Sequence, residues 1–195
     1  FTTSTHDTIL FFTNKGKLYH LKGYEIPEAG RTAKGTAIVN LLSLDAGEKV
    51  SAVIPIQNFA EGKYLLMATK NGLIKKTALK EYNSARKTGL QAITLKEDDE
   101  LIGVRLTDGE DNVVLVTRNG MCITFDEKDV RPIGRVAQGV IGIRIDEDDE
   151  VIGMESIIAG GKATLLAITE NGFGKRTDLD EYRVQIRGGK GVITY

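Results

Sequence analysis

Short apolar runs alternate with glycine-containing turns along the whole chain, and no segment has the three-to-four-residue spacing of apolar positions that predicts an amphipathic helix. Four segments place an apolar strand, a threonine, a glycine turn and a second strand in the same order. These segments are 10–22, 65–79, 114–125 and 165–179. Because short runs rich in Val, Ile, Leu and Thr between glycine turns favour strands, the pattern predicts an all-β fold.

Glycine positions mark an internal repeat of about 50 residues. Each repeat has a first glycine in its hairpin turn and a second glycine fewer than twenty residues later. The first glycines are Gly16, Gly72, Gly120 and Gly172, and the second are Gly35, Gly89, Gly139 and Gly191. Acidic stretches add a third mark at 96–104 and 146–154, with a weaker relative at 44–53. We predict a single domain, 1–195, with repeats at approximately 8–60, 64–111, 113–160 and 164–195.

The second repeat predicts four strands, with the sequences YLLMAT, LIKKTAL, LQAITL and LIGVRLT. The first two are joined by Asn71 and Gly72, and Asn-Gly between strands predicts a type I′ turn, in which both central residues have positive φ. Repeating four-stranded units are typical of propeller-like folds, whose blades bury their faces against their neighbours. The WD type fits poorly, because its period is about 40 to 45 residues and this chain has no tryptophan.

Charge is distributed unevenly, although the formal net charge is only -1. Three stretches, 97–100, 108–111 and 146–150, hold nearly half of the 27 acidic residues and no basic residue, and we interpret them as solvated β-turns. Basic residues recur just after the hairpin glycine and just before the second glycine. Corresponding positions of successive blades lie at the same radius, so these residues predict a ring of positive charge along one edge of the disc. The ring is uneven, because the third repeat has no cation after its hairpin glycine.

The loop QIRGGKG, residues 185–191, combines two cations with three glycines and is the richest of four equivalent loops, the others being 30–36, 84–90 and 134–140. A need for positive φ explains its last glycine, whereas a guanidinium and an ammonium beside exposed backbone N–H groups suit a phosphate clamp. A solvated face is the alternative interpretation of such cations. The candidate DNA-binding residues are Arg31, Lys34, Lys75, Lys76, Arg86, Lys87, Arg135, Lys175, Arg176, Arg187 and Lys190.

Catalytic and metal-binding motifs are not evident. His6 and His20 lack HExxH spacing, and the glycine pair in residues 30–36 lacks the lysine of a P-loop. The acidic stretches lack the ligand spacing of calcium loops. Cys122 is the one cysteine and is expected to be a buried small hydrophobic residue, so we predict no catalytic residue, metal site or cofactor in this chain.

No run approaches the ~18 consecutive apolar residues of a membrane helix, and the N-terminal residues do not resemble a signal peptide. We therefore expect a cytoplasmic protein that does not associate with membranes. The last repeat stops after three predicted strands, so we also expect the chain to be part of a longer protein.

The quoted motifs carry a resemblance to a known family. Residues 5–42 and the segments MATKNGLIKKTALKEYN, DDELIGV and TENGFGKRTDLDEYR are similar to the C-terminal domain of bacterial DNA gyrase A, and secondly to that of topoisomerase IV. The resemblance implies a β-pinwheel, a propeller-like disc of six blades that exchange strands, of which this chain would hold about four blades of four strands. It covers essentially all 195 residues.

The resemblance also implies a function. In that family, DNA wraps around the basic perimeter, and an ATP-dependent type II topoisomerase, an isomerase, thereby introduces negative supercoils. Duplex DNA, gyrase B and a second copy of gyrase A would be the partners in the parent heterotetramer, which uses ATP and Mg through gyrase B. QIRGGKG matches six of seven positions of the family's signature box, which normally precedes the first blade, with Ile186 in place of a basic residue. A protein-interaction propeller without a nucleic-acid role is the alternative.

Overall fold

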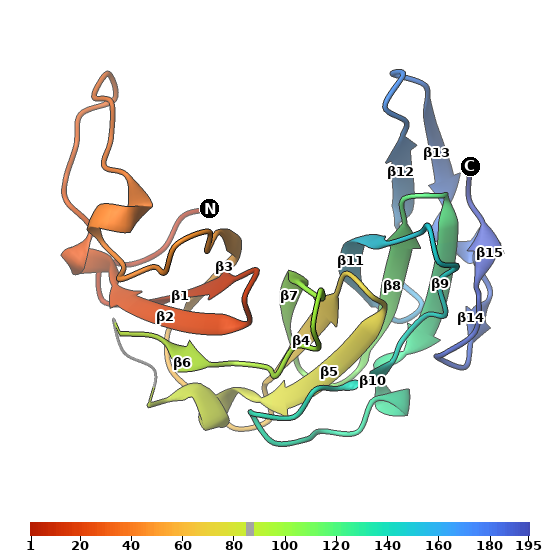
Figure 1. The fold of residues 1–195 in the computed structure, drawn as a ribbon, viewed down its shortest axis with the longest axis horizontal. Coiled ribbons are helices and arrows are strands. Elements are labelled where there is room, and N and C mark those ends of the chain that lie inside the picture. Colours follow the sequence, from red (N-terminus) through yellow and green to blue (C-terminus); the bar gives the residue numbers. More distant parts are fainter. Residues whose placement is uncertain (85–87) are drawn as a thin grey trace.

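Four β-sheets follow one another along an open arc in the computed structural model, which describes residues 1–84 and 88–195 (Figure 1). We name them blades 1 to 4 in chain order. Blade 1 has the strand order β3-β1-β2-β6, blade 2 β7-β4-β5-β10 and blade 3 β11-β8-β9-β14, while blade 4 is the hairpin β12-β13. The fold is all-β, as the sequence predicts, and the chain forms an arc and not a closed disc.

Within a repeat, two strands form a hairpin and a third lies on its inner side. These strands are β1 (Thr8–Thr13), β2 (Lys17–Lys22) and β3 (Val50–Ile56) in blade 1; β4 (Tyr64–Thr69), β5 (Leu73–Ala78) and β7 (Leu101–Thr107) in blade 2; β8 (Asp111–Thr117), β9 (Met121–Asp126) and β11 (Val151–Ile158) in blade 3; β12 (Thr164–Ile168) and β13 (Gly174–Asp178) in blade 4. All of these strands pair antiparallel.

The outermost strand of each complete blade comes from the following repeat. β6 (Leu90–Gln91) pairs with β2, and β10 (Val140–Ile141) pairs with β5. β14 (Val184–Gln185) and β15 (Val192–Ile193) both pair with β9. This exchange confirms the pinwheel arrangement, and it places these four short strands on the convex side of the arc, with β3, β7 and β11 on the concave side (Figure 1).

Hairpin turns in the four repeats have one geometry, which differs from the predicted type I′ turn. Gly72 N donates to Thr69 O at 3.0 Å, and only Gly72 of this turn has positive φ, because Asp98 is the one non-glycine residue with positive φ in the described part of the chain. The turn is therefore a type I turn followed by a left-handed glycine. The repeated threonine also has a role: its Oγ1 accepts a bond from the backbone N–H four residues later, as in Leu73 N to Thr69 Oγ1 at 3.2 Å.

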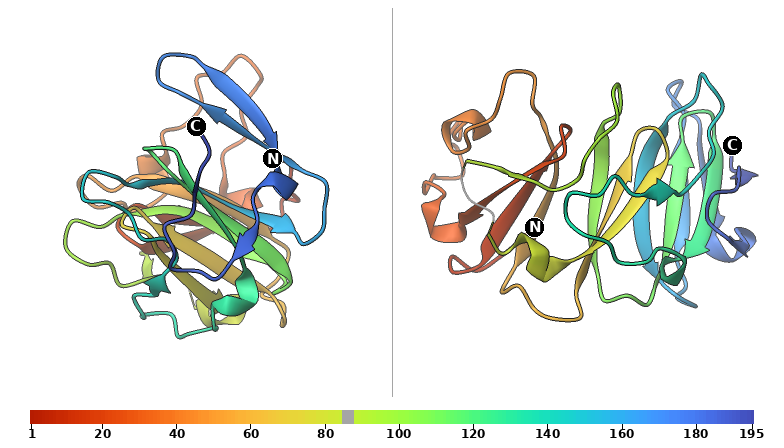
Figure 2. Two further views of the ribbon diagram at one scale, coloured as in Figure 1. Left: turned by 90° about the vertical axis from the view of Figure 1, so that its right-hand side faces the viewer. Right: turned by 60° about the horizontal axis from the view of Figure 1, so that its bottom comes forward.

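The hydrophobic core lies between consecutive blades, because both faces of the inner hairpins are covered. Leu10 and Phe12 of blade 1 pack with Leu65 and Met67 of blade 2, and all four are fully buried. A second cluster joins blade 2 to blade 3, and a smaller one joins blade 3 to blade 4. Figure 2 shows the sheets stacked face to face along the arc. Burial at both faces explains why these strands read as nearly continuous apolar runs.

Short 3-10 turns follow the second strand of each hairpin: η1 (Gly23–Glu25), η3 (Leu79–Tyr82), η4 (Glu127–Asp129) and η5 (Leu179–Glu181). One further turn, η2 (Ile38–Asn40), lies in the first repeat, beside an exposed segment that contains residues 27–37. Leu42 after this turn is buried against the outer face of blade 1. None of the helical turns in the described residues is long or apolar enough to cross a membrane.

Candidate nucleic-acid interface

The convex perimeter of the arc is built from the short outer strands and the loops that lead into them. The loops of the second, third and fourth repeats end in the second glycine of the repeat, where the backbone approaches the neighbouring strand closely. A Cβ atom at Gly191 would lie 2.3 Å from Cys122 O, and one at Gly139 would lie 2.7 Å from Ile74 O. Both glycines also have positive φ. Gly191, the last glycine of QIRGGKG, is therefore required for the loop to pack against blade 3.

Five of the predicted cations are exposed. Arg31 and Lys34 lie on the exposed segment of the first repeat, and Lys175 and Arg176 lie on β13. Lys190 lies in the loop between β14 and β15, and its Nζ pairs with Asp146 at 2.8 Å in an exposed ion pair. Screening by solvent makes such a pair weak, so Lys190 can exchange its partner for a phosphate.

Two predicted cations are buried, so their assignment to an exposed rim is wrong. Lys75 has 0% and Lys76 4% of its surface exposed. They lie in β5, the second strand of blade 2, whose two faces are covered by the neighbouring blades and whose edge is covered by β10. Neither ammonium group can reach a phosphate outside the molecule in this arrangement. Arg86 and Lys87 lie outside the described residues.

Lys75 joins the outer parts of two blades. Its Nζ donates to Ala92 O at 2.6 Å, to Tyr82 Oη at 3.3 Å and to Arg135 O. Ala92 follows the outer strand of blade 1, whereas Arg135 precedes that of blade 2. Burial is the main cause that lowers the pKa of Lys75 to about 7, and the nearby Arg135 guanidinium adds to the effect. Lys175, its counterpart in the fourth repeat, donates to Thr194 O at 3.5 Å.

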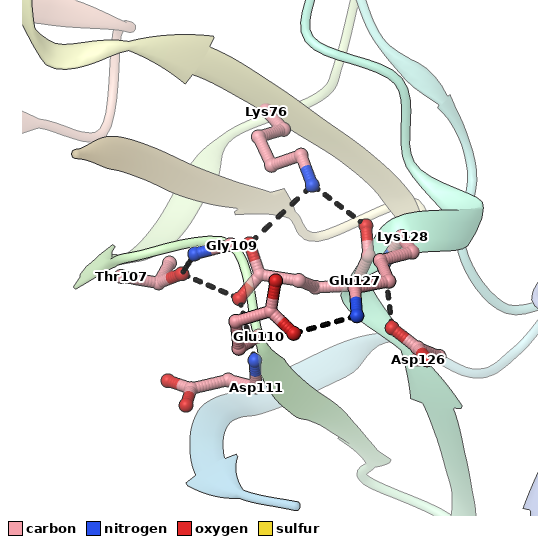
Figure 3. Close-up of polar contacts among 8 residues, drawn as sticks. All are labelled: Lys76, Thr107, Gly109, Glu110, Asp111, Asp126, Glu127 and Lys128. Atoms are coloured by element: carbon pink, nitrogen blue, oxygen red, sulfur yellow. Dashed lines mark hydrogen bonds and ion pairs between the residues drawn. The ribbon is translucent and has the colours of Figure 1, made fainter. Parts of the chain in front are cut away.

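Lys76 belongs to a polar cluster centred on Glu127, which is fully buried (Figure 3). The Lys76 ammonium lies 2.9 Å from Glu127 O and 3.4 Å from Glu127 Oε1. The second carboxylate oxygen of Glu127 accepts from Asp111 N at 3.0 Å and from the Thr107 hydroxyl. Since removing one partner of a buried pair leaves an uncompensated charge, the cluster fixes η4 against both blades.

Two predicted arginines are half-buried at the perimeter, and both contact backbone oxygens. Arg135 Nη1 donates to Gln91 O at 2.5 Å. Arg187 donates from Nη1 to Ile141 O and from Nε to Asp129 O, both at 2.9 Å. These side chains lie at the perimeter, and part of their hydrogen-bonding capacity is already used within the protein.

The structure adds basic residues that the repeat analysis did not identify. Arg131 and Arg183 are exposed, and each follows the 3-10 turn of its repeat by two residues. They are equivalent positions, eleven residues after Gly120 and Gly172, and that recurrence was the signal available in the sequence. Arg144, just beyond β10, is exposed as well. Together with Lys190 these arginines supply positive charge along the perimeter of blades 2 and 3.

Two of the three acidic stretches, 97–100 and 146–150, form β-turns as predicted, whereas 108–111 forms a bend before β8, and the two turns are not simply solvated. Asp99 is 7% exposed, and its Oδ1 accepts bonds from Asn71 N and Glu100 N, both at 2.9 Å. Asp149 makes the equivalent contacts with Asn119 N and Glu150 N, at 2.9 and 2.8 Å. These carboxylates hold the hairpin turns of blades 2 and 3, at the opposite end of the strands from the 3-10 turns. The stretches 97–100 and 146–150 are thereby separated from Arg131 and Arg183, whereas 108–111 lies beside η4, where Glu110 pairs with Lys128 at 2.6 Å.

Other candidate chemistry is sparse. Cys122 is fully buried, as predicted, and burial raises the pKa of its thiol to about 11. His20 is half-buried in β2, where burial lowers the pKa of its imidazole. Among residues 1–84 and 88–195, no three His, Cys, Asp or Glu side chains are grouped so that they could hold a metal ion.

Comparison with known proteins gives several related gyrases. DNA gyrase A of Clostridium acetobutylicum is 57% identical over 195 residues, which are 100% of this chain and 23% of that protein. DNA gyrase A of Staphylococcus aureus is 45% identical over 194 residues, 99% of this chain and 22% of that protein. The chain therefore spans less than a quarter of the length of these relatives.

Solved structures and a family model agree with this result. The crystal structure of the C-terminal domain of DNA topoisomerase IV has a TM-score of 0.90 at 35% identity, covering 98% of this chain and 59% of that one. A structure of the DNA gyrase A C-terminal domain has a TM-score of 0.80 at 27% identity, covering 97% and 60%. The family model of the DNA gyrase C-terminal domain, beta-propeller, matches residues 7–57, 63–108, 111–158 and 163–195. The chain belongs to the family of β-propeller C-terminal domains of DNA gyrase A.

Proposed function

We propose that this chain binds duplex DNA along its convex perimeter and bends the DNA around the arc without reading its sequence. The observation that carries the proposal is the recurrence of exposed cations along that perimeter in successive repeats. Arg131 and Arg183 occupy equivalent positions, and Lys190 and Arg144 lie between them along the outer strands. Cations arranged on a convex edge neutralise phosphates of a duplex that follows the same curve.

Electrostatics accounts for the energy that bending requires. Turning about 20 to 30 base pairs through 40 to 90° costs of order 1–6 kcal/mol. Contacts to several phosphates release condensed counterions and offset that cost. The proposed contacts are made to phosphates, so binding depends on the geometry and deformability of the duplex and not on its base sequence.

Within a longer protein, the same binding would present a DNA crossing of one sign to the part of the enzyme that passes one duplex through another. The relatives that support this step are DNA gyrase A proteins, whose full length is about four times that of this chain. Gyrase B and a second copy of gyrase A would be the partners there, and ATP and Mg would act through gyrase B. The 195-residue chain would contribute DNA binding in the bacterial cytoplasm and no catalytic group.

Titration of a fluorescent duplex with the chain at several salt concentrations tests the proposal. The logarithm of the association constant should fall with the logarithm of salt, with a slope of about -0.9 for each phosphate contacted. Arg183→Ala and Lys190→Ala should each weaken binding and reduce this slope by about one. Lys49→Ala is the matched control, because Lys49 is exposed but lies beside the innermost strand β3. No binding at low salt, or a salt-independent affinity, would refute the proposal.

A further inference from the structure

Arg135 and Arg187 occupy equivalent positions, four residues before the second glycine of their repeats. Each guanidinium reaches from its own blade to the outer strand of the preceding blade. Arg135 Nη1 contacts Gln91 O of β6 at 2.5 Å, and Arg187 Nη1 contacts Ile141 O of β10 at 2.9 Å. The two acceptors are equivalent as well, because each lies two residues after the second glycine of the preceding repeat. The same bond therefore occurs at two successive joints of the arc.

The guanidinium of Arg187 also holds its own blade. Its Nε donates to Asp129 O at 2.9 Å, and Asp129 ends the η4 turn of blade 3. One planar group thus bridges a carbonyl of blade 3 and a carbonyl of blade 2. Lysine carries the same charge, but its single ammonium on a flexible stem lacks the fixed geometry of two donors at one planar centre. The requirement here is for the shape of the guanidinium and not for its charge alone.

Besides the hydrophobic core, two recurrent contacts, one inner and one outer, lie at the joint between consecutive blades. On the inner side, a backbone bond recurs: Leu101 N donates to Asn14 O at 2.9 Å, and Val151 N donates to Lys70 O at 2.8 Å. On the outer side, the arginine bonds define how far apart the blades stand. A wider or looser outer joint would change the angle at which one blade follows the next.

We propose that Arg135 and Arg187 are positioning residues that set the angle between blades, and through it the curvature that bound DNA must follow. The proposal rests on the proposed function and deepens it. Phosphate binding then falls mainly to residues such as Arg131, Arg183 and Lys190, while these two arginines shape the track. Backbone bonds at the same joint, such as Arg144 N to Gly189 O at 2.9 Å, supply adhesion that a substitution of the arginines leaves in place.

The test compares the wild-type chain with the double variant Arg135→Lys/Arg187→Lys and with Lys190→Ala. Small-angle X-ray scattering without DNA measures the shape of the arc, and circular dichroism verifies that each variant is folded. Ligation of nicked circular DNA at saturating protein measures the linking-number change per bound chain. The single variant Arg187→Lys, which alters one joint only, serves if the double variant does not fold.

The double variant should change the scattering profile and lose part of the linking-number change. Its DNA affinity should stay within about twofold of wild type, because each charge is retained. Lys190→Ala should lower the affinity and leave both the arc shape and the linking-number change at saturation unaltered. An unchanged scattering profile overturns the proposal, even if DNA wrapping is lost, because a direct DNA contact would then be the cause. A changed profile in a chain that does not bind DNA refutes the proposed function but supports the role of the two arginines in setting the angle between blades.

Discussion

Replacing the buried Lys75 with methionine tests how a charge-bearing side chain is accommodated between two blades. Methionine fills a similar volume without an ionisable group, but it removes the donor to Arg135 O and leaves Ala92 O with the Tyr82 hydroxyl alone, at 3.0 Å. We therefore expect Lys75→Met to be less stable than wild type at neutral pH. The informative quantity is the pH dependence of this difference, because only the wild type has a titrating group at this position.

The sign of the effect follows from the two pKa values of Lys75. Burial lowers the pKa to about 7 in the folded chain, whereas an unfolded lysine titrates near 10.4. Between these values the unfolded chain holds a proton that the folded chain lacks, so the free energy of unfolding rises with pH. The slope approaches about 1.4 kcal/mol per pH unit, and from pH 7.5 to 9 the wild type should gain up to about 2 kcal/mol relative to Lys75→Met. Well below pH 7 both states are protonated and the difference is constant.

Urea denaturation of both proteins at several pH values measures the difference, and its change with pH isolates Lys75 from groups that both proteins share. Titration of the Lys75 side-chain ¹³Cε resonance by NMR, assigned by its loss in Lys75→Met, reports the folded pKa directly. A resonance that titrates near 10, together with a stability difference that does not vary from pH 7.5 to 9, would refute the reasoning. In that case the three oxygen acceptors would compensate fully for the burial of the ammonium.

Three further substitutions should lower the free energy of unfolding, measured by urea denaturation. Gly191→Ala should cost at least about 2 kcal/mol, because alanine would be strained at positive φ and its Cβ would clash with a backbone oxygen 2.3 Å away. Glu127→Gln should cost about 3 kcal/mol, since it leaves the Lys76 ammonium buried without its carboxylate. Asp99→Ala should cost about 1 kcal/mol and Glu97→Ala almost nothing, because only Asp99 accepts bonds from the hairpin turn. Equal effects of the last two would contradict this assignment.

Much of the fold could be predicted because local sequence features define each repeat. Each hairpin requires a left-handed glycine and a threonine at fixed positions, so Gly72 and Thr69 and their counterparts mark the same structural point in each repeat. Apolar runs around them identify the strands. The turn type was predicted wrongly because the dipeptide Asn-Gly occurs both in type I′ turns and in type I turns that are followed by a glycine. The register of the two strands decides which of these turns forms.

Burial of the strand cations could not be predicted from periodicity. A lysine at the third or fourth position after a hairpin glycine lies on the second strand, and that strand is an exposed edge only if no outer strand covers it. In the pinwheel, β10 comes from the next repeat and covers β5. Lys76 is therefore enclosed by residues about 50 positions away in the sequence, and Lys75 by Arg135 as well as by the nearer Tyr82 and Ala92. Lys76 pairs with the carboxylate of Glu127, which is equally distant in the sequence and lies in a segment without any metal or catalytic motif.

Repeat equivalence therefore predicts where a residue lies in a blade, but not what surrounds it. Tyr19 and Ile123 occupy the position of Lys75 in the first and third blades, and both are fully buried. The Tyr19 hydroxyl donates to the buried Glu48 at 2.9 Å, whereas Lys75 meets backbone oxygens. This position thus has different chemistry in each repeat. Lys75 and Ile123 lie at joints between blades, whereas Tyr19 lies in the cluster on the outer face of blade 1. A positive track along the arc must instead be built from loop positions such as Arg131 and Arg183, which follow the 3-10 turns and remain exposed in both repeats that carry them.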